Sequence, residues 1–313
     1  AVPTMLGITF LTFGMIHLAP GDYVSLEIES MGKTRIPKEI IEEFRRAYNL
    51  DKPVHVQYAL WLKKIVTLDF GDSFIDHRPV LDRILMHMPA TMTLNLLSFA
   101  LAMAIGIPLG IFQAVKHKSF FDKASGTILY MFWSLPTFWI GILLIILFSS
   151  KLQWLPSGGM TSLFLEAAPW EAFVDRLRHL ALPVLTLSLG SVAFESRFAR
   201  ASFLEVIRQD YIRTAMAKGL APRTVLFKHA LRNALIPILT LFGNILPFLI
   251  SGSIIIEIVF SWPGVGQLVY RSMLARDYPT VMGMTFLTAV LVLISMLLTD
   301  LLYAVADPRV RYS

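Results

Sequence analysis

Six long stretches of the chain are rich in apolar residues and contain no Asp, Glu, Lys or Arg. Such a stretch predicts a membrane-spanning helix when it has about 20 residues, the length that crosses the hydrocarbon core of a bilayer. Five of the six meet that length, and in the shorter fourth the long stems of Glu195 and Arg197 would let their charges reach the headgroups. We therefore predict six transmembrane helices, over residues 1–21, 84–115, 124–150, 179–194, 233–256 and 278–299.

The composition favours the same class of protein. Apolar residues make up 55% of the 313 residues and charged residues only 16%, whereas soluble domains carry about 25% charged residues. This excludes a soluble globular enzyme, a disordered tail and a collagen-like chain. The absence of cysteine from the sequence excludes disulfides, thiolate metal ligands and cysteine nucleophiles. Neither the basic start nor the cleavage site of a signal peptide is evident after Ala1, which leaves open whether the first helix is complete.

The net charge of +6 is distributed unequally along the chain. With six spans, segments 116–123, 197–232 and 304–313 share one side and carry thirteen basic against four acidic residues. The connecting segments on the other side carry fifteen basic against sixteen acidic residues. Short loops rich in Lys and Arg stay in the cytoplasm. Both termini are therefore expected there, and the charge indicates topology rather than nucleic-acid binding.

The segment 19–88 is expected on the extracytoplasmic side as a helical insertion between the first two spans. Apolar residues at helical spacing from Ile36 to Tyr48 predict one helix, and residues Val54 to Val66 predict another. The insertion either only connects the spans or faces a substrate or partner, since segments of this length are often functional.

Glycine and proline positions predict how the spans pack and bend. Gly106 and Gly110 form a G-x-x-x-G pattern, which favours close helix packing either within the chain or against another subunit. Pro136, Pro237 and Pro247 would kink or break their helices, which a bilayer tolerates only where neighbours or a water-lined cavity satisfy the freed backbone groups.

No set of residues suited to covalent chemistry is evident, so the chain is not expected to be an enzyme. The seven histidines lack metal-binding spacing and are expected at the surface or the membrane interface. Gly32-Lys33-Thr34 lacks the preceding glycine of a phosphate-binding loop, because Glu27 occupies that position. Glu195, Glu257 and Asp300 lie near predicted helix ends, where headgroup-level solvation or a basic neighbour would suffice.

Two classes of polytopic membrane protein can be weighed against these observations. A secondary transporter or channel driven by an ion gradient predicts midplane acids or an inverted repeat of broken helices. An intramembrane hydrolase needs a nucleophile–base or metal pair deep in the spans. The sequence shows neither feature clearly.

The segment Arg197–Arg232 predicts two helical pieces separated by a break. Gly219 can adopt the left-handed conformation that ends a helix, and Pro222 follows at the usual offset. The preceding piece, from Tyr211 to Lys218, is a short basic helix between two spans. On physical grounds it either presses into a groove of a cytoplasmic partner or lies on anionic lipid.

Several motifs from near the start of the chain to its end carry a family resemblance. They are Leu18–Asp22, Asn49–Pro53, Asp210–Leu220, His229–Pro237, Phe260–Gly266, Arg276–Pro279 and Asp300–Arg311. These motifs resemble the permeases of ABC importers, most closely the dipeptide, oligopeptide and nickel branch and its first-permease type. The general importer signature begins Glu-Ala-Ala, whereas this chain has Arg213, Thr214 and Ala215, as in the peptide branch.

The resemblance implies one all-α ABC-transporter transmembrane domain over residues 1–313, in a prokaryotic cell membrane. Such a permease takes up dipeptides or oligopeptides by alternating access; nickel chelates and oligosaccharides are the alternative substrates. The resemblance also implies four kinds of partner: a second homologous permease in a heterodimer, two ATPase subunits, an extracytoplasmic solute-binding protein and the lipid bilayer. ATP and Mg would be bound by the ATPase subunits, and no cofactor or metal by this chain.

The resemblance and the turn-forming residues together predict the functional positions. In this family the segment from Thr214 to Leu220 is the coupling helix, which sits in a cleft of the ATPase. The residues expected to mediate ATPase coupling are Arg213, Thr214, Ala215, Lys218, Gly219, Leu220 and Arg223. The turn at Trp262, Pro263, Gly264 and Gly266 predicts an outer gate whose short helix dips back toward the pore, with an ordinary surface turn as the alternative. The translocation pathway is expected near Pro136, Asn244, Pro247 and Ser251.

Overall fold

A computed structural model of the chain describes residues 2–18, 42, 46, 51–162, 168–239, 248–249 and 252–306. Within these ranges the chain is helical apart from turns and one isolated antiparallel bridge between Asp72 and Pro79, and it contains no β-strand. The predicted all-α class is therefore confirmed for this part of the chain. The helices, of which η1 and η2 are π-helical, are α1 (Val2–Leu18), α4 (Val54–Val66), α5 (Val80–Val115), α6 (Phe120–Ser134), α7 (Thr137–Leu144), η1 (Ile145–Lys151), α8 (Pro169–Ile207), α9 (Asp210–Ala217), α10 (Pro222–Thr224), η2 (Val225–Leu231), α11 (Arg232–Leu239), α13 (Ile254–Val259), α14 (Val265–Leu274) and α15 (Tyr278–Ala306).

Three of these helices are long and apolar enough to cross a membrane on their own: α5, α8 and the Tyr278–Leu298 part of α15. A fourth candidate span is α6 together with α7 and η1, which meet at a bend of 100°. Helix α1 is apolar but has 17 residues. A helix thus lies in each of the six charge-free runs, while six complete spans remain a prediction.

The bend between α6 and α7 lies at Leu135 and Pro136. Leu135 is extended, with φ −82° and ψ 140°, because the ring of a following proline disfavours the helical conformation. The predicted break at Pro136 is confirmed, and residues 124–150 do not form one straight helix. Pro108 in α5 and Pro183 in α8, by contrast, lie inside continuous helices.

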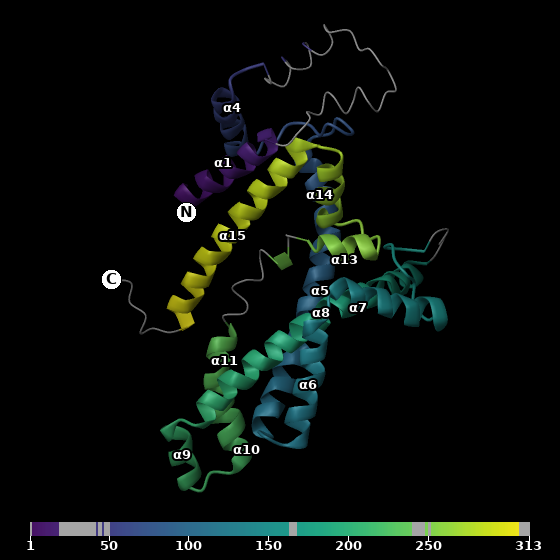
Figure 1. The fold of residues 1–313 in the computed structure, drawn as a ribbon. Coiled ribbons are helices and arrows are strands. Elements are labelled where there is room, and N and C mark those ends of the chain that lie inside the picture. The colour runs from purple at the N-terminus through teal and green to yellow at the C-terminus, as the bar shows by residue number, and fades with distance from the viewer. Residues whose placement is uncertain are drawn as a thin grey trace.

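Helices α5 and α8 pack side by side and run in the same direction (Figure 1). Near their starts Leu94 of α5 shares an apolar cluster with Leu180 of α8. Near their ends Ala114 shares another cluster with Phe203. Because the contacts advance along both helices together, the chain must travel back between them, and α6 to η1 form the helical part of that return.

The two helices approach closely because glycines of α5 lie where it contacts α8. A Cβ atom on Gly110 would collide with the backbone carbonyl of Ser196 and lie 3.0 Å from the Cβ of Ala199. A Cβ on Gly106 would lie 3.0 Å from the Cβ of Glu195. The G-x-x-x-G pattern therefore serves packing within the chain, which decides between the two alternatives left by the sequence.

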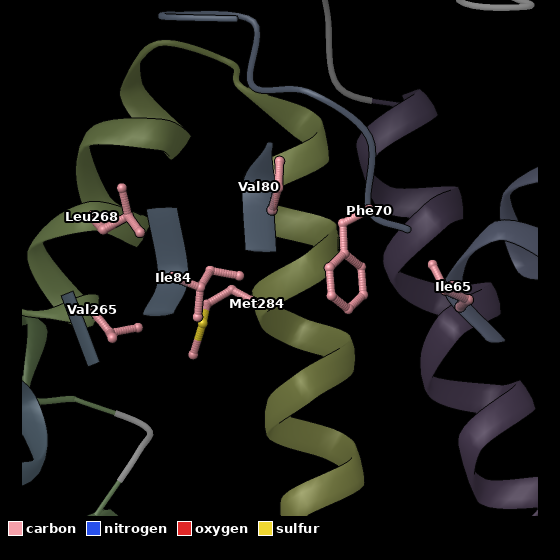
Figure 2. Packing of buried hydrophobic residues seen from close by; sticks show 7 residues of the cluster. All are labelled: Ile65, Phe70, Val80, Ile84, Val265, Leu268 and Met284. Atoms are coloured by element: carbon pink, nitrogen blue, oxygen red, sulfur yellow. The ribbon is translucent and has the colours of Figure 1, made fainter. Parts of the chain in front are cut away.

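At the end of the molecule where α5 begins, α14 and α15 pack against α5 and against the segment that precedes it. Figure 2 shows Val265 and Leu268 of α14 facing Ile84 of α5 and Met284 of α15. The complete buried cluster comprises Ile65, Phe70, Val80, Ile84, Val265, Leu268 and Met284.

A buried carboxylate reinforces this end of the molecule. Asp277, just before α15, is fully buried and accepts hydrogen bonds from the Ser73 hydroxyl at 2.7 Å and the Phe74 amide at 3.0 Å. Its Oδ2 also lies 2.7 Å from the Arg83 guanidinium of α5 and 2.7 Å from the Thr280 hydroxyl. These hydrogen bonds and the ion pair hold the segment before α5 against the start of α15, two parts of the chain that are far apart in sequence.

The predicted helix from Val54 to Val66 is confirmed as α4. It packs on α1 through Tyr58, whose hydroxyl lies 3.0 Å from the Thr9 hydroxyl and whose ring meets that of Phe13 edge to face. The other predicted helix of the insertion lies outside the described residues. The boundaries 19–88 and 197–232 stay predictions.

Two expectations about polar side chains are wrong. His179 is buried rather than superficial, with Nδ1 3.0 Å from the Gly158 carbonyl and Nε2 3.3 Å from the Ser162 hydroxyl. Glu195 lies inside α8 rather than at a span end, and one of its carboxylate oxygens has no hydrogen-bond partner within the described part of the chain. Tertiary packing explains both, since the loop before α8 covers His179 and α5 covers Glu195.

The close contact between α5 and α8 at Gly110 leads to a prediction about stability. We expect Gly110→Ala to destabilise the protein by about 1–3 kcal/mol, the usual cost of overpacking, because the new methyl group meets backbone that cannot rotate away. Gly126→Ala in α6 is the matched control: nothing lies within 4 Å of its Cβ position, so the change should be neutral or stabilising by up to about 1 kcal/mol. Thermal unfolding in detergent measures both, and equal melting temperatures for the two variants would contradict the close contact.

Candidate functional site

The predicted break after the short basic helix is present as a complete helix C-cap. After α9 ends at Ala217, Gly219 adopts φ +75°. Its amide donates to the Met216 carbonyl at 3.0 Å, and the Leu220 amide donates to the Ala215 carbonyl at 3.4 Å. This pair of bonds is the Schellman motif, which satisfies carbonyls that a helix end leaves unpaired. Pro222 then starts α10, as predicted.

Helix α9 has one face in the protein core and one face exposed. Ile212 and Ala215 are buried in a cluster with Phe203 of α8 and Val225 of η2. Six of the seven residues predicted for ATPase coupling are exposed, namely Arg213, Thr214, Lys218, Gly219, Leu220 and Arg223. Ala215 is the exception, because its side chain packs against the chain's own core and is not offered to a partner.

Further bonds fix α9 relative to the helices beside it. The Asn233 amide of α11 donates to the Tyr211 hydroxyl at 2.9 Å. Within α9 the Thr214 hydroxyl donates to the Asp210 carbonyl at 2.9 Å, and the exposed Arg213 lies 3.4 Å from the Asp210 carboxylate. The helix is thus a firmly seated projection at the end of α8, at the opposite end of the molecule from α4 and α14 (Figure 1).

The predicted outer-gate residues form the turn between α13 and α14. Trp262 is fully buried and its indole N–H donates to the Ala90 carbonyl of α5 at 2.9 Å. Gly264 and Gly266 are buried as well, whereas Pro263 is half-buried. The alternative of an ordinary surface turn is wrong, because the turn is embedded against α5 and is followed by the predicted short helix, α14.

Glu257 organises this turn, a role that sequence reasoning missed. It is fully buried, and its carboxylate accepts the Thr91 hydroxyl at 2.9 Å and the Gln267 amide at 2.8 Å. Thr91 in turn accepts the Val265 amide at 2.8 Å. The acid therefore satisfies free amides at the start of α14, where the helix dipole also favours a negative charge. The expectation that solvation or a basic neighbour would accommodate Glu257 is wrong.

Three glycines around Glu257, two at the turn and one before α13, leave room for its carboxylate. A Cβ on Gly264 would lie 2.5 Å from Oε1 of Glu257, one on Gly266 2.9 Å from Oε2, and one on Gly252 3.0 Å from Oε1. The signal available in the sequence was the acid at the end of an apolar run, followed seven and nine residues later by glycines.

The pathway residues are only partly described. Pro136 is exposed at the bend between α6 and α7, while Asn244, Pro247 and Ser251 lie outside the described residues. The Asn95 side chain of α5 donates at 2.7 Å to the carbonyl of Phe248, the residue that follows Pro247 in the sequence. Within the described ranges no group of three or more His, Asp or Glu could hold a metal ion. The arrangement presents two structured turns at opposite ends of paired helices, which suits mechanical coupling.

Comparison with known proteins covers nearly the whole chain. Residues 106–312 match the family described as binding-protein-dependent transport system inner membrane component, and residues 1–95 match its N-terminal membrane component. The oligopeptide transport system permease protein AppB of Bacillus subtilis is 41% identical over 100% of this chain and 96% of its own length. The di/tripeptide transport system permease protein DppB of Pseudomonas aeruginosa is 38% identical over 99% of this chain and 96% of its own.

A solved structure shares the fold. The inward-facing MetNI methionine ABC transporter has a chain that aligns with a TM-score of 0.55 at 20% identity, covering 72% of this chain and 97% of that one. The match supports the helical arrangement and carries no information on what this chain transports.

Substitution of Glu257 is predicted to lower stability, and a conservative substitution at the same position should restore part of it. Glu257→Ala leaves the Thr91 hydroxyl and the α14 amides without an acceptor, and each such buried group costs about 1–3 kcal/mol. We expect a lower melting temperature, with partial recovery in Glu257→Gln, which keeps one acceptor oxygen. Glu205→Ala, at an exposed acid of α8, is the control and should leave stability unchanged. Equal stability of Glu257→Ala and wild type would remove the organising role.

Proposed function

Because the chain belongs to the family of binding-protein-dependent transport system inner membrane components, we propose that it is the permease subunit of an ATP-driven ABC importer for dipeptides or oligopeptides. The observation that carries the proposal is the end-to-end similarity to permeases of oligopeptide and di/tripeptide transport systems. Nickel chelates and oligosaccharides are the alternative cargoes. The chain performs no covalent chemistry of its own.

The proposed topology has six spans with both termini in the cytoplasm. Its support is the charge asymmetry of the loops and the parallel course of α5 and α8, which requires one crossing between them. Helix α15 begins beside the start of α5, so the second, fourth and sixth spans all start at one end. That end carries α4 and α14 and faces outward, whereas α9 faces the cytoplasm.

The proposed partners are supported by the family to which the chain belongs and by its similarity to permeases of peptide transport systems. A second, homologous permease completes the pathway, two ATPase subunits bind ATP and Mg in the cytoplasm, and a solute-binding protein delivers peptide on the outer side. The exposed face of α9, with Arg213 and Lys218, docks into a cleft of one ATPase. This chain contributes neither a cofactor nor a metal ligand.

Alternating access uses the two ends of the α5–α8 pair. When ATP draws the ATPase subunits together, α9 moves with them, and its buried face, through Phe203 and Ala114, carries the ends of α8 and α5 along. At the other end α5 holds the Trp262 turn through Ala90 and Thr91. The α5–α8 pair therefore transmits movement from the ATPase to the outer gate. ATP hydrolysis then returns the cavity to its inward-facing state.

Topology is tested by cysteine labelling, which is clean because the sequence has no cysteine. Lys64 of α4 and Lys123 near the start of α6 are both exposed. In right-side-out membrane vesicles an impermeant maleimide should label Lys64→Cys and spare Lys123→Cys, with both labelled after permeabilisation. Labelling of position 123 but not of position 64 before permeabilisation would reverse the topology.

Coupling is tested at Gly219. Nothing lies within 4 Å of its Cβ position, so Gly219→Val acts only through backbone strain: a side chain at φ +75° costs about 1–2 kcal/mol, and more for a β-branched one. We expect the variant to insert normally and to lose about tenfold in ATPase affinity, which corresponds to about 1.4 kcal/mol. Copurification and substrate-stimulated ATP hydrolysis in nanodiscs measure the loss.

Gly219→Asn is the matched control, because asparagine tolerates the left-handed conformation. It should retain assembly and stimulation close to those of wild type. If Gly219→Val also assembles and responds like wild type, the segment is not the coupling helix, and its alternative role as a basic patch on anionic lipid gains support.

A further inference from the structure

A half-open cavity of about 650 Å³ lies between the ends of α5 and α8 and the segment that follows α9. Most of its lining is apolar, with Val115 of α5, Leu204 of α8, Leu220 and Leu226 among the contributing residues. His117 and Arg208 are its basic lining residues, and no acidic residue of the described chain lines it. Its volume falls within the roughly 300–1,000 Å³ of ordinary ligand pockets.

The cavity lies where the apolar part of α5 ends. Val115 is the last residue of the charge-free run 84–115, and the next three residues are Lys116, His117 and Lys118. In the proposed topology this boundary corresponds to the level at which acyl chains meet headgroups on the cytoplasmic side. Large apolar side chains nearby are exposed, including Phe227 of η2 at 67%, as expected of a surface that faces lipid.

The charges around the cavity suit an anion. Asp122 is the acid nearest to His117, and it is already neutralised by Arg200, whose Nε and Nη2 each lie 2.8 Å from a carboxylate oxygen. Arg208 is exposed and forms no ion pair with a described residue. Segments 116–123 and 197–232 together carry eleven basic and three acidic residues.

We propose that the cavity binds one acidic phospholipid of the cytoplasmic leaflet. An acyl chain enters between Val115 and Leu204, where burial of each CH₂ is favourable, and the phosphate lies at Arg208 and His117. Basic pockets between transmembrane helices on the cytoplasmic side commonly hold such headgroups. The acyl chain contacts Leu220, directly after the Gly219 cap, so the lipid supports the coupling segment.

The test uses the complete purified complex in nanodiscs of phosphatidylcholine with a minor fraction of phosphatidylglycerol. The readout is the lipid retained by the protein after extraction, measured by native mass spectrometry, which does not depend on transport or ATP hydrolysis. The variants are Arg208→Gln, to remove the headgroup charge, and Leu204→Trp, to fill the cavity. Lys228→Gln is the matched control, since Lys228 is exposed on η2 and does not line the cavity.

We expect wild type to enrich phosphatidylglycerol over phosphatidylcholine. Arg208 lines the cavity, and loss of its direct contact with the headgroup in Arg208→Gln, about 1 kcal/mol, should reduce the enrichment about fivefold. Lys228 does not line the cavity, so Lys228→Gln removes no direct headgroup contact and should leave the enrichment within about twofold. Leu204→Trp should displace both lipids while the melting temperature of the complex is retained; if it unfolds, Leu226→Phe fills the opposite wall.

Three results would overturn the proposal. One is absence of enrichment in wild type, and another is equal loss in Arg208→Gln and Lys228→Gln, which would mean diffuse attraction by the whole basic surface. The third is a cavity-filling variant that keeps its lipid but no longer copurifies with the ATPase, because the cavity would then receive a protein side chain. Failure of the importer assignment would leave the lipid measurement unaffected.

Discussion

The close parallel contact between α5 and α8 is the constraint on which the rest of the structure depends. In a bilayer, helix association relies on van der Waals packing rather than on burial from water, so small residues that let backbones approach are decisive. Gly106 and Gly110 supply that approach against Glu195 to Ala199 of α8. Once the two helices are fixed in parallel, the chain must return through α6 and α7, and the Trp262 turn and the C-cap of α9 lie toward opposite ends of the pair.

Each end of the α5–α8 pair is completed by a different physical device. At the end where α4 and α14 lie, buried carboxylates hold the helices in place: Glu257 accepts an amide at the start of α14, and Asp277 joins α15 to the segment before α5. Such charges are costly to bury unless they are fully hydrogen-bonded, and here hydroxyls, amides or a guanidinium satisfy them. At the other end an apolar cluster seats α9 through Ile212 and Ala215. The turn between α13 and α14 is therefore specified by polar geometry, and the position of α9 by the shape of its apolar face.

Much of this architecture could be predicted from local sequence. The charge-free runs indicated where the helices lie, and Pro136 indicated the bend between α6 and α7. Gly219 and Pro222 indicated the C-cap of α9. Each of these features depends only on residues that are close together in the chain. What could not be predicted depends on contacts between distant residues. The glycines that follow Glu257 indicate a close contact there, but they do not show that Thr91 of α5 will satisfy the carboxylate. Likewise, nothing near Ala215 indicates that Phe203 will cover it. The packing of His179 under its preceding loop belongs to the same class.

The proposed mechanism requires that α5 and α8 move as one body and so connect α9, the proposed coupling helix, to the Trp262 turn, the proposed outer gate. The most direct test is a spin-label distance between Leu85→Cys, exposed at the start of α5, and Ala201→Cys, exposed near the end of α8, in the complete complex. The distance is measured by pulsed electron paramagnetic resonance without nucleotide and after trapping with ATP and vanadate. We predict the same distance in both states. A shift of several ångströms would mean that the two helices slide or bend during transport, and would contradict it.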